Sequence, residues 1–162
     1  TAGLHFTDAL KKEVRQKRDW AELTLHVGLG TFASLNEEHL KSGRLHEESY
    51  EVSAAVLEKI RAAFHVTAVG TTSVRTLESI YADTFKKNSA AAIKSATDIF
   101  IQPGFEFQRV NSLITNFHLP GTSLLLLTAA FVGNEDELLK IYTHAIHEKY
   151  RFYSFGDCML VL

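Results

Sequence analysis

Apolar residues recur along this chain with two kinds of spacing, which divide the sequence into expected helices and strands. Apolar positions three and four residues apart, each series preceded by Ser, Thr, Asp or Asn, are typical of capped amphipathic helices. This pattern predicts helices over residues 7–18, 53–64, 73–87, 122–132 and 134–150. Short alternating or continuous apolar runs predict strands over 20–27, 48–52, 65–70, 98–101 and 159–162, and a further extended region over 105–117 that is broken near Asn111.

The order of these elements predicts the fold class. Strands that alternate with helices indicate an α/β protein, here one layered domain over residues 1–162 with helices flanking a mixed, mostly parallel sheet. Residues 36–43 are expected to form a loop or short helix, and residues 88–96, rich in small side chains, a flexible connection. Phe64 and Ile146 are expected on the inward faces of their helices.

Composition and charge narrow the class of protein. The chain has 162 residues, 46% of them apolar and 22% charged, which is the range of a globular domain with a proper core. A net charge of −2 gives no general basic field, so an RNA partner would have to be held by a local patch. Cys158 is the only cysteine, which excludes an internal disulfide and favours a cytoplasmic protein without a cysteine-based metal site. The longest apolar run, 124–132, is too short to span a bilayer, so no membrane association is expected.

The stretch Val69-Gly-Thr-Thr-Ser-Val-Arg-Thr-Leu-Glu78 resembles the end of a buried strand followed by the first turns of a helix. A helix N-terminus leaves backbone N–H groups unpaired and carries partial positive charge, so it attracts anions. Thr71, Thr72 and Ser73 can cap the helix or bind a ligand, and Arg75 adds a planar fork of donors. The stretch predicts an anion- or carboxylate-binding site, while an ordinary capped helix remains the alternative.

Two glycines, Gly28 and Gly30, follow the first predicted strand and fit the pattern G-x-G-x-x-A of dinucleotide-binding proteins. That pattern needs an apolar, sheet-packing helix directly after it, and the polar segment 35–43 is a poor one. A dinucleotide site is therefore disfavoured. The glycines can instead let the backbone approach a ligand closely.

Several histidines are candidates for proton transfer. His26 lies beside the glycine turn, and His118 lies where the strand before Leu119-Pro120 ends, which is the usual place of α/β active sites. His46 with Glu48 combines an imidazole with a carboxylate, although charged runs are usually solvated surface. No metal site is expected, because the only histidine pair with ligand spacing has no evident third ligand.

The segment 150–157 interleaves aromatic residues with Arg151 and ends at Asp157. Aromatic faces can stack on bases and arginine can hold phosphate, so Arg151 and Asp157 are candidate substrate-binding residues. Taken alone, the aromatic residues favour a core-packed chain end.

Five motifs occur here in one order: Thr1-Ala-Gly-Leu-His-Phe6, Thr24-Leu-His-Val-Gly-Leu-Gly-Thr-Phe32, Val69–Glu78, Thr115-Asn-Phe-His-Leu-Pro120 and Tyr150-Arg-Phe-Tyr-Ser-Phe-Gly-Asp157. Together they make residues 1 to 162 resemble the C-terminal part of the S-adenosylmethionine:tRNA ribosyltransferase-isomerases of queuosine biosynthesis. The resemblance implies that S-adenosylmethionine is a substrate, not a cofactor. Its ribosyl group is moved to the aminomethyl group of a 7-deazaguanine base in a tRNA anticodon stem-loop. Isomerisation then gives epoxyqueuosine and releases adenine and methionine.

This chemistry needs a base to remove a proton next to the sulfonium, an acid to assist the departure of adenine, and groups that orient the donor. The candidate catalytic residues under this resemblance are His26, His118, His46 and Glu48. The expected substrate-binding residues are Gly28, Gly30, Thr71, Thr72, Ser73, Arg75, Arg151 and Asp157.

The chain departs from the family pattern in two respects. The family's His-x-Met-His-x-Glu segment corresponds to Gly43, Leu45, His46 and Glu48, so its first histidine is missing. Family members also carry an N-terminal portion, with an inserted β-rich domain, before the equivalent of Thr1. Without that portion the sheet is expected to expose an edge that favours a homo-oligomer. The alternatives are a non-catalytic fragment that folds and self-associates, and an α/β enzyme that binds another anionic small molecule.

Overall fold

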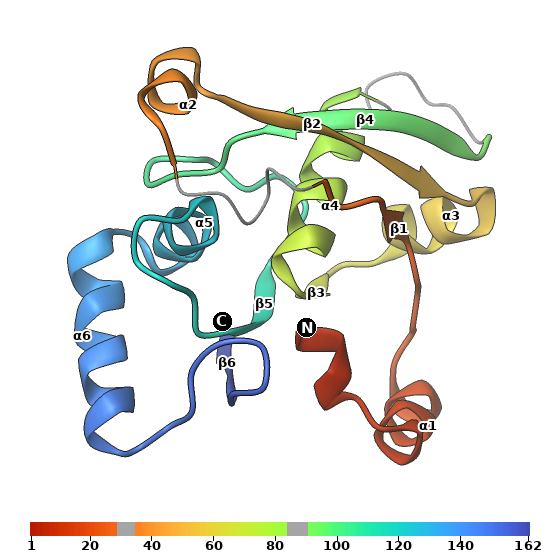
Figure 1. Cartoon of the computed structure of the whole chain (residues 1–162). Coiled ribbons are helices and arrows are strands. Elements are labelled where there is room, and N and C mark those ends of the chain that lie inside the picture. Colours follow the sequence, from red (N-terminus) through yellow and green to blue (C-terminus); the bar gives the residue numbers. More distant parts are fainter. Residues whose placement is uncertain (29–34, 84–90) are drawn as a thin grey trace.

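The computed structural model describes residues 1–28, 35–83 and 91–162 and consists of helices packed around two small sheets (Figure 1). The elements in chain order are η1 (Ala2–His5), α1 (Asp8–Lys17), β1 (Thr24–Leu25), α2 (Glu37–Ser42), β2 (Arg44–Val52), α3 (Ala54–Ala62), β3 (Thr67–Val69), α4 (Thr71–Asp83), β4 (Ile93–Ile99), β5 (Ser112–Asn116), α5 (Ser123–Val132), α6 (Glu135–His147) and β6 (Cys158–Val161). The predicted α/β class is confirmed.

The described strands form two sheets that are joined through α4. One sheet has the order β1-β2-β4 with antiparallel pairs, and the other has the order β3-β5-β6. Among the strands that the structure describes, only β3 and β5 are parallel, and β6 returns antiparallel to β5. The mixed character is as predicted, but "mostly parallel" is wrong for these strands, because apolar spacing carries no information on strand direction. Helix α4 contacts strands of both sheets and lies between them in Figure 1.

Helices begin where the sequence supplies a capping side chain. Thr7, Ser53, Thr122 and Asn134 each accept a hydrogen bond from the backbone N–H three residues further on. These contacts satisfy donors that a helix start leaves unpaired, and they confirm the predicted starts of α1, α3, α5 and α6. None of the helices in the described ranges is long and apolar enough to cross a membrane.

The buried side chains form two groups. The larger lies around α4 and both sheets and includes Tyr50, Leu57, Ile80 and Leu113, all fully buried. The second lies between α5, α6 and the end of β5, where Phe117 stacks on Phe152 with ring centroids 4.6 Å apart. Helix α5, apolar nearly all round, is largely buried as predicted.

Three expectations about single segments are wrong. Residues 93–96, expected in a flexible connection, belong to β4, because they pair with β2 over a long antiparallel register. Phe64 is fully exposed, because α3 ends at Ala62 and the next residue is extended, which breaks the helical phase. Ile146 is 64% exposed, because α6 buries only a narrow stripe of residues.

Candidate active site at the ends of β3 and β5 and along α4

The parallel pair β3 and β5 brings two predicted site segments to one edge of their sheet. Gly70 and Thr71 follow β3, and His118 follows β5 by two residues. The carboxyl ends of parallel strands meet at the same edge, which is where α/β proteins bind ligands. Gly70 donates its N–H to the Ile114 carbonyl at 2.8 Å and has a φ of +89°, a conformation that favours glycine.

The hydroxyl residues after Gly70 have different surroundings. The Ser73 hydroxyl donates to the Val69 carbonyl at 2.8 Å, so it ties α4 to β3 and does not cap the helix. Thr71 is the first residue of α4 and is buried, and the Thr72 carbonyl accepts a hydrogen bond from the Thr76 hydroxyl at 3.0 Å. Thr71 and Thr72 therefore stay candidates, while the Ser73 hydroxyl is engaged within the fold.

The short helix η1 packs against this edge. Ala2 is buried, and its Cβ lies 3.8 Å from the position that a Cβ would take at Gly70. Helix η1 also contacts β5, and both ends of the chain lie beside that strand in Figure 1. The motif at residues 1–6 thus meets the motif at residues 69–78.

His118 is held in a defined position beside β5. Its Nε2 lies 2.8 Å from the Thr115 hydroxyl oxygen, and its backbone N–H donates to the Tyr142 hydroxyl at 2.9 Å. Burial lowers the pKa of His118 to about 4. The imidazole is therefore neutral near pH 7.

The segment 150–157 docks on the same end of β5. Tyr153 donates its N–H to the Phe117 carbonyl at 3.2 Å, and the Asn116 side-chain amide donates to the Tyr153 carbonyl at 3.0 Å. These hydrogen bonds, together with the Phe117–Phe152 stack, agree with the core-packed alternative for the aromatic residues of this segment. The motif at 150–157 therefore joins the group at this edge.

Arg151 and Asp157 close the loop upon itself. Arg151 Nη2 donates to Asp157 Oδ1 at 2.7 Å, and the Arg151 backbone N–H donates to Oδ2 at 2.8 Å. The Arg151 hydrogen bonds lower the pKa of Asp157 to about 2. Gly156 is required inside this loop, because a Cβ there would lie 2.3 Å from a backbone carbonyl oxygen. The two predicted substrate-binding residues are thus partners of each other, with most of the Arg151 side chain exposed.

A buried ion pair connects three further predicted residues. Arg75 Nη1 on α4 donates to Glu48 Oε2 on β2, and both side chains are at least 97% buried. The other carboxylate oxygen of Glu48 accepts the N–H of Gly28 at 2.7 Å. Glu48 therefore connects Gly28 to α4. Removing one member of such a pair leaves an uncompensated buried charge and costs about 3–5 kcal/mol in other proteins.

Two polar residues that the sequence had not singled out lie beside this pair. Ser79, four residues after Arg75, donates to the Arg75 carbonyl at 2.8 Å and lies 2.6 Å from the Thr97 hydroxyl oxygen on β4. Thr97 is the cross-strand neighbour of Glu48. Helical spacing from Arg75 would have placed Ser79 on the same face. Arg75 Nε and Nη2 are buried without a hydrogen-bond partner among the residues described, and each such donor costs about 1–3 kcal/mol.

Glu78 is a structural carboxylate that sequence reasoning did not assign. It is buried and accepts the backbone N–H groups of residues 108–110 at 2.8–3.0 Å. Within the same loop, Arg109 donates to the carbonyls of Ile60 and Ala63 at the end of α3. These contacts fix the loop that leads into β5. The sequence signal for this role is that Glu78 is the last residue of the motif at 69–78.

The remaining histidine candidates are on the surface. His26 is exposed, and its backbone N–H donates to the Ser49 carbonyl at 2.8 Å. His46 is exposed and packs edge-on against the buried His39 ring, with centroids 4.9 Å apart. His46 and Glu48 thus have different surroundings, since an irregularity in β2 between Arg44 and Glu48 interrupts the alternation. Gly30 lies outside the described residues.

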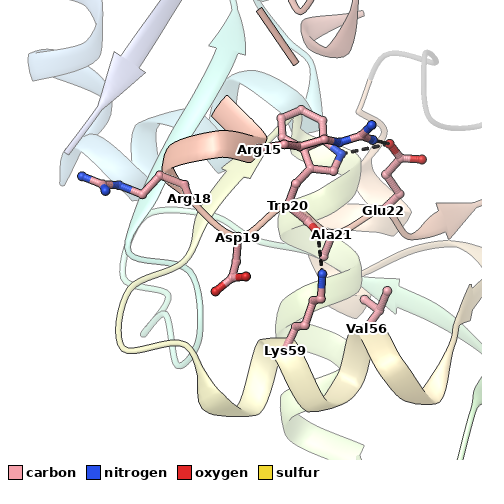
Figure 2. A pocket seen from close by; sticks show the side chains of 8 residues that line it. All are labelled: Arg15, Arg18, Asp19, Trp20, Ala21, Glu22, Val56 and Lys59. Carbon is pink, nitrogen blue, oxygen red and sulfur yellow. Dashed lines mark hydrogen bonds and ion pairs between the residues drawn. The ribbon is translucent and has the colours of Figure 1, made fainter. Parts of the chain in front are cut away.

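A separate depression of about 430 Å³ lies between α1, the segment after it and α3 (Figure 2). The Arg15 guanidinium carbon lies 5.5 Å from the centroid of the Trp20 ring, and both residues donate to the Glu22 carboxylate at 2.9 Å. Lys59 donates to the Trp20 carbonyl at 3.2 Å. The described candidate residues do not line this depression, and the acidic side chains among its walls offset its cations. Residues 1–28, 35–83 and 91–162 contain no cluster of three potential metal ligands.

The family model described as "Queuosine biosynthesis protein" matches residues 1–161. This chain belongs to that family. The queuosine family thus accounts for the order of the five motifs, four of which meet at the ends of β3 and β5.

Two curated relatives carry the name S-adenosylmethionine:tRNA ribosyltransferase-isomerase. That of Solibacter usitatus is 48% identical over 163 residues, and that of Carboxydothermus hydrogenoformans is 48% identical over 167 residues. Both matches cover all of this chain but only 44% and 48% of the relatives, so the chain spans about half their length. The crystal structure of S-adenosylmethionine tRNA ribosyltransferase from Thermotoga maritima is 41% identical with a TM-score of 0.80, over all of this chain and 52% of that one.

Proposed function

We propose that this chain forms part of the active site of a transferase-isomerase that uses S-adenosylmethionine as ribosyl donor. The acceptor is the 7-aminomethyl-7-deazaguanine base in a tRNA anticodon stem-loop, and the product is epoxyqueuosine. The observation that carries this proposal is the convergence of the family's motif segments on α4 and on the carboxyl ends of β3 and β5. Relatives at 48% identity support it through the reaction in their name.

The pKa of His118 decides which role suits it. A histidine with a pKa of about 4 carries its proton in roughly one molecule in a thousand at pH 7, so the neutral imidazole is the form that meets a substrate. We assign His118 to proton acceptance next to the sulfonium, and leave the acid role to His26 or His46. Glu48 then acts by holding Gly28 and Arg75 in place.

The other proposed roles follow from position and chemistry. The donor and the tRNA are bound by Gly28, Gly30, Thr71, Thr72, Arg75, Arg151 and Asp157. Ser73 supports the start of α4 through its hydrogen bond to the Val69 carbonyl. S-adenosylmethionine takes part as a substrate, with no further cofactor, in the cytoplasm. The edge strand β6 carries Leu160, which is 55% exposed, and self-association through this edge is part of the proposal.

Isothermal titration of the 162-residue chain with S-adenosylmethionine, and then with the modified anticodon stem-loop, tests the proposal. We expect binding of both and release of adenine on mixing. Binding of neither would refute the proposed site and favour a non-catalytic fragment. Binding only of another phosphorylated metabolite would favour a different anionic ligand. Light scattering during the same measurement reports the oligomeric state.

A further inference from the structure

The guanidinium of Arg75 has one side in use and one side open. Nη1 donates to Glu48, whereas Nε and Nη2 have no hydrogen-bond partner in the part of the chain that the structure describes. The N–H bonds of Nε and Nη2 point the same way from a planar group, so together they form an edge that matches the two oxygens of a carboxylate. The side chain is 3% exposed, so this edge is directed into the protein.

The arrangement of Glu48 explains why the edge stays open. A carboxylate that served only to neutralise an arginine would place both of its oxygens on the fork. Here Glu48 gives one oxygen to Arg75 and the other to the N–H of Gly28 at 2.7 Å. Glu48 therefore orients the guanidinium without filling it. The Ser79 hydroxyl forms its hydrogen bonds with the Arg75 backbone carbonyl and the Thr97 hydroxyl, and not with the guanidinium.

We propose that the Nε–Nη2 edge of Arg75 binds the carboxylate of the amino-acid tail of the S-adenosylmethionine donor. This inference rests on the proposed function and adds which atoms of the protein meet which group of the donor. A carboxylate at the end of a flexible tail can reach a buried fork. The phosphodiester of an RNA backbone is carried on a bulky strand and cannot. The second turn of α4 also places this fork near the positive end of the helix.

The burial of the fork has a kinetic consequence. Both nitrogens are shut off from solvent in the ligand-free chain, so the groups that cover them have to move aside by local opening. Binding that waits for such a step is slower than ordinary docking, for which association rate constants are about 10⁵–10⁷ M⁻¹s⁻¹. The observed rate of donor binding should therefore level off at high donor concentration.

Calorimetric titration of the 162-residue chain with two donors tests the inference. The first is S-adenosylmethionine, and the second is its decarboxylated form, which keeps the adenosine, the sulfonium and the amine. Loss of a bidentate pair between charges should weaken the binding of the decarboxylated form by about 10- to 100-fold. In R75K the lysine keeps a charge beside Glu48 but has no planar fork, so the two donors should bind within about threefold of each other. The matched control is R44K, at an exposed arginine on β2 that pairs with Asp98 at 2.7 Å.

The outcomes separate the inference from the function on which it rests. Equal affinity of the unchanged chain for both donors overturns the carboxylate assignment and leaves donor binding intact. Selectivity that persists in R75K also overturns it. No binding of either donor by the unchanged chain refutes the proposed function together with the inference. If R75K fails to fold, the comparison of the two donors on the unchanged chain decides by itself whether the donor carboxylate is recognised. A loss of selectivity between the donors in R44K would contradict the assignment to Arg75.

Discussion

Protonation of His118 should destabilise the fold, because burial disfavours the charged imidazole. The pKa of His118 is about 4 in the folded chain, against an ordinary value of about 6.5. The unfolded chain therefore binds more protons than the folded one between these two pH values. Stability from this group is fully present above pH 6.5 and is lost as the pH falls toward 4.

The size of the effect follows from the two pKa values. Linkage between them gives a loss of about 2 kcal/mol between pH 7 and pH 5, and about 3 kcal/mol by pH 4. The steepest slope is about 1.4 kcal/mol per pH unit, the value for one proton. A loss of this size is a large fraction of the ~5–15 kcal/mol that stabilises most folded domains.

Urea unfolding at several pH values between 7 and 4.5 measures this loss of stability. Acidic side chains also titrate in this range, so the unchanged chain is compared with H118Q, whose amide can still reach Thr115. As the pH falls, the free energy of unfolding of H118Q should decrease less than that of the unchanged chain, and the difference should equal the loss worked out above for His118. H144Q, at an exposed histidine of α6, should follow the unchanged chain. Parallel curves for the unchanged chain and H118Q would refute the reasoning, as would an NMR titration of the His118 ring with a midpoint near 6.5.

Two further substitutions test structural contacts beside the site. E78Q removes an anionic acceptor of three backbone N–H groups and should reduce the free energy of unfolding, measured in urea, by about 2–3 kcal/mol. E58Q, at an exposed position of α3, should leave it unchanged, and equal effects of the two substitutions would contradict the anchoring role. G156A places a Cβ 2.3 Å from a backbone carbonyl oxygen and should lower the free energy of unfolding by about 1–3 kcal/mol. G3A is the control and should leave it unchanged, because a Cβ at Gly3 meets no atom within 4 Å. An unchanged melting temperature for G156A would show that the loop relaxes freely.

The starts of helices could be predicted from the sequence, because capping is local. Thr7, Ser53, Thr122 and Asn134 each act on a backbone N–H only three residues away, so neighbouring sequence determines the outcome. Strand direction is not local. Residues 93–96 lie in a segment, 88–96, that is rich in small residues and predicts a flexible connection, yet they form a strand because β2 pairs with them.

The same distinction applies to the site. Arg75 and Gly28 could be identified as candidates from their motifs, but the residue that joins them, Glu48, had been grouped with its sequence neighbour His46. The pairing of Glu48 with Arg75 spans 27 positions and depends on how α4 packs against the sheet of β1, β2 and β4. Burial is equally a property of the fold, so the low pKa of His118 could not be anticipated from its motif.

Helix α4 holds the parts of the site together. From its first turn onward it is hydrogen-bonded to β3 through Ser73, to Glu48 on β2 through Arg75, and to the loop before β5 through Glu78. Glu48 in turn accepts the N–H of Gly28. These polar side chains are also buried or half-buried within the core, so a substitution among them changes site geometry and fold stability together. A lower activity in an α4 variant therefore does not by itself identify a ligand contact. Changes made to the ligand, such as removal of the donor carboxylate, leave the helix intact and so distinguish binding from support.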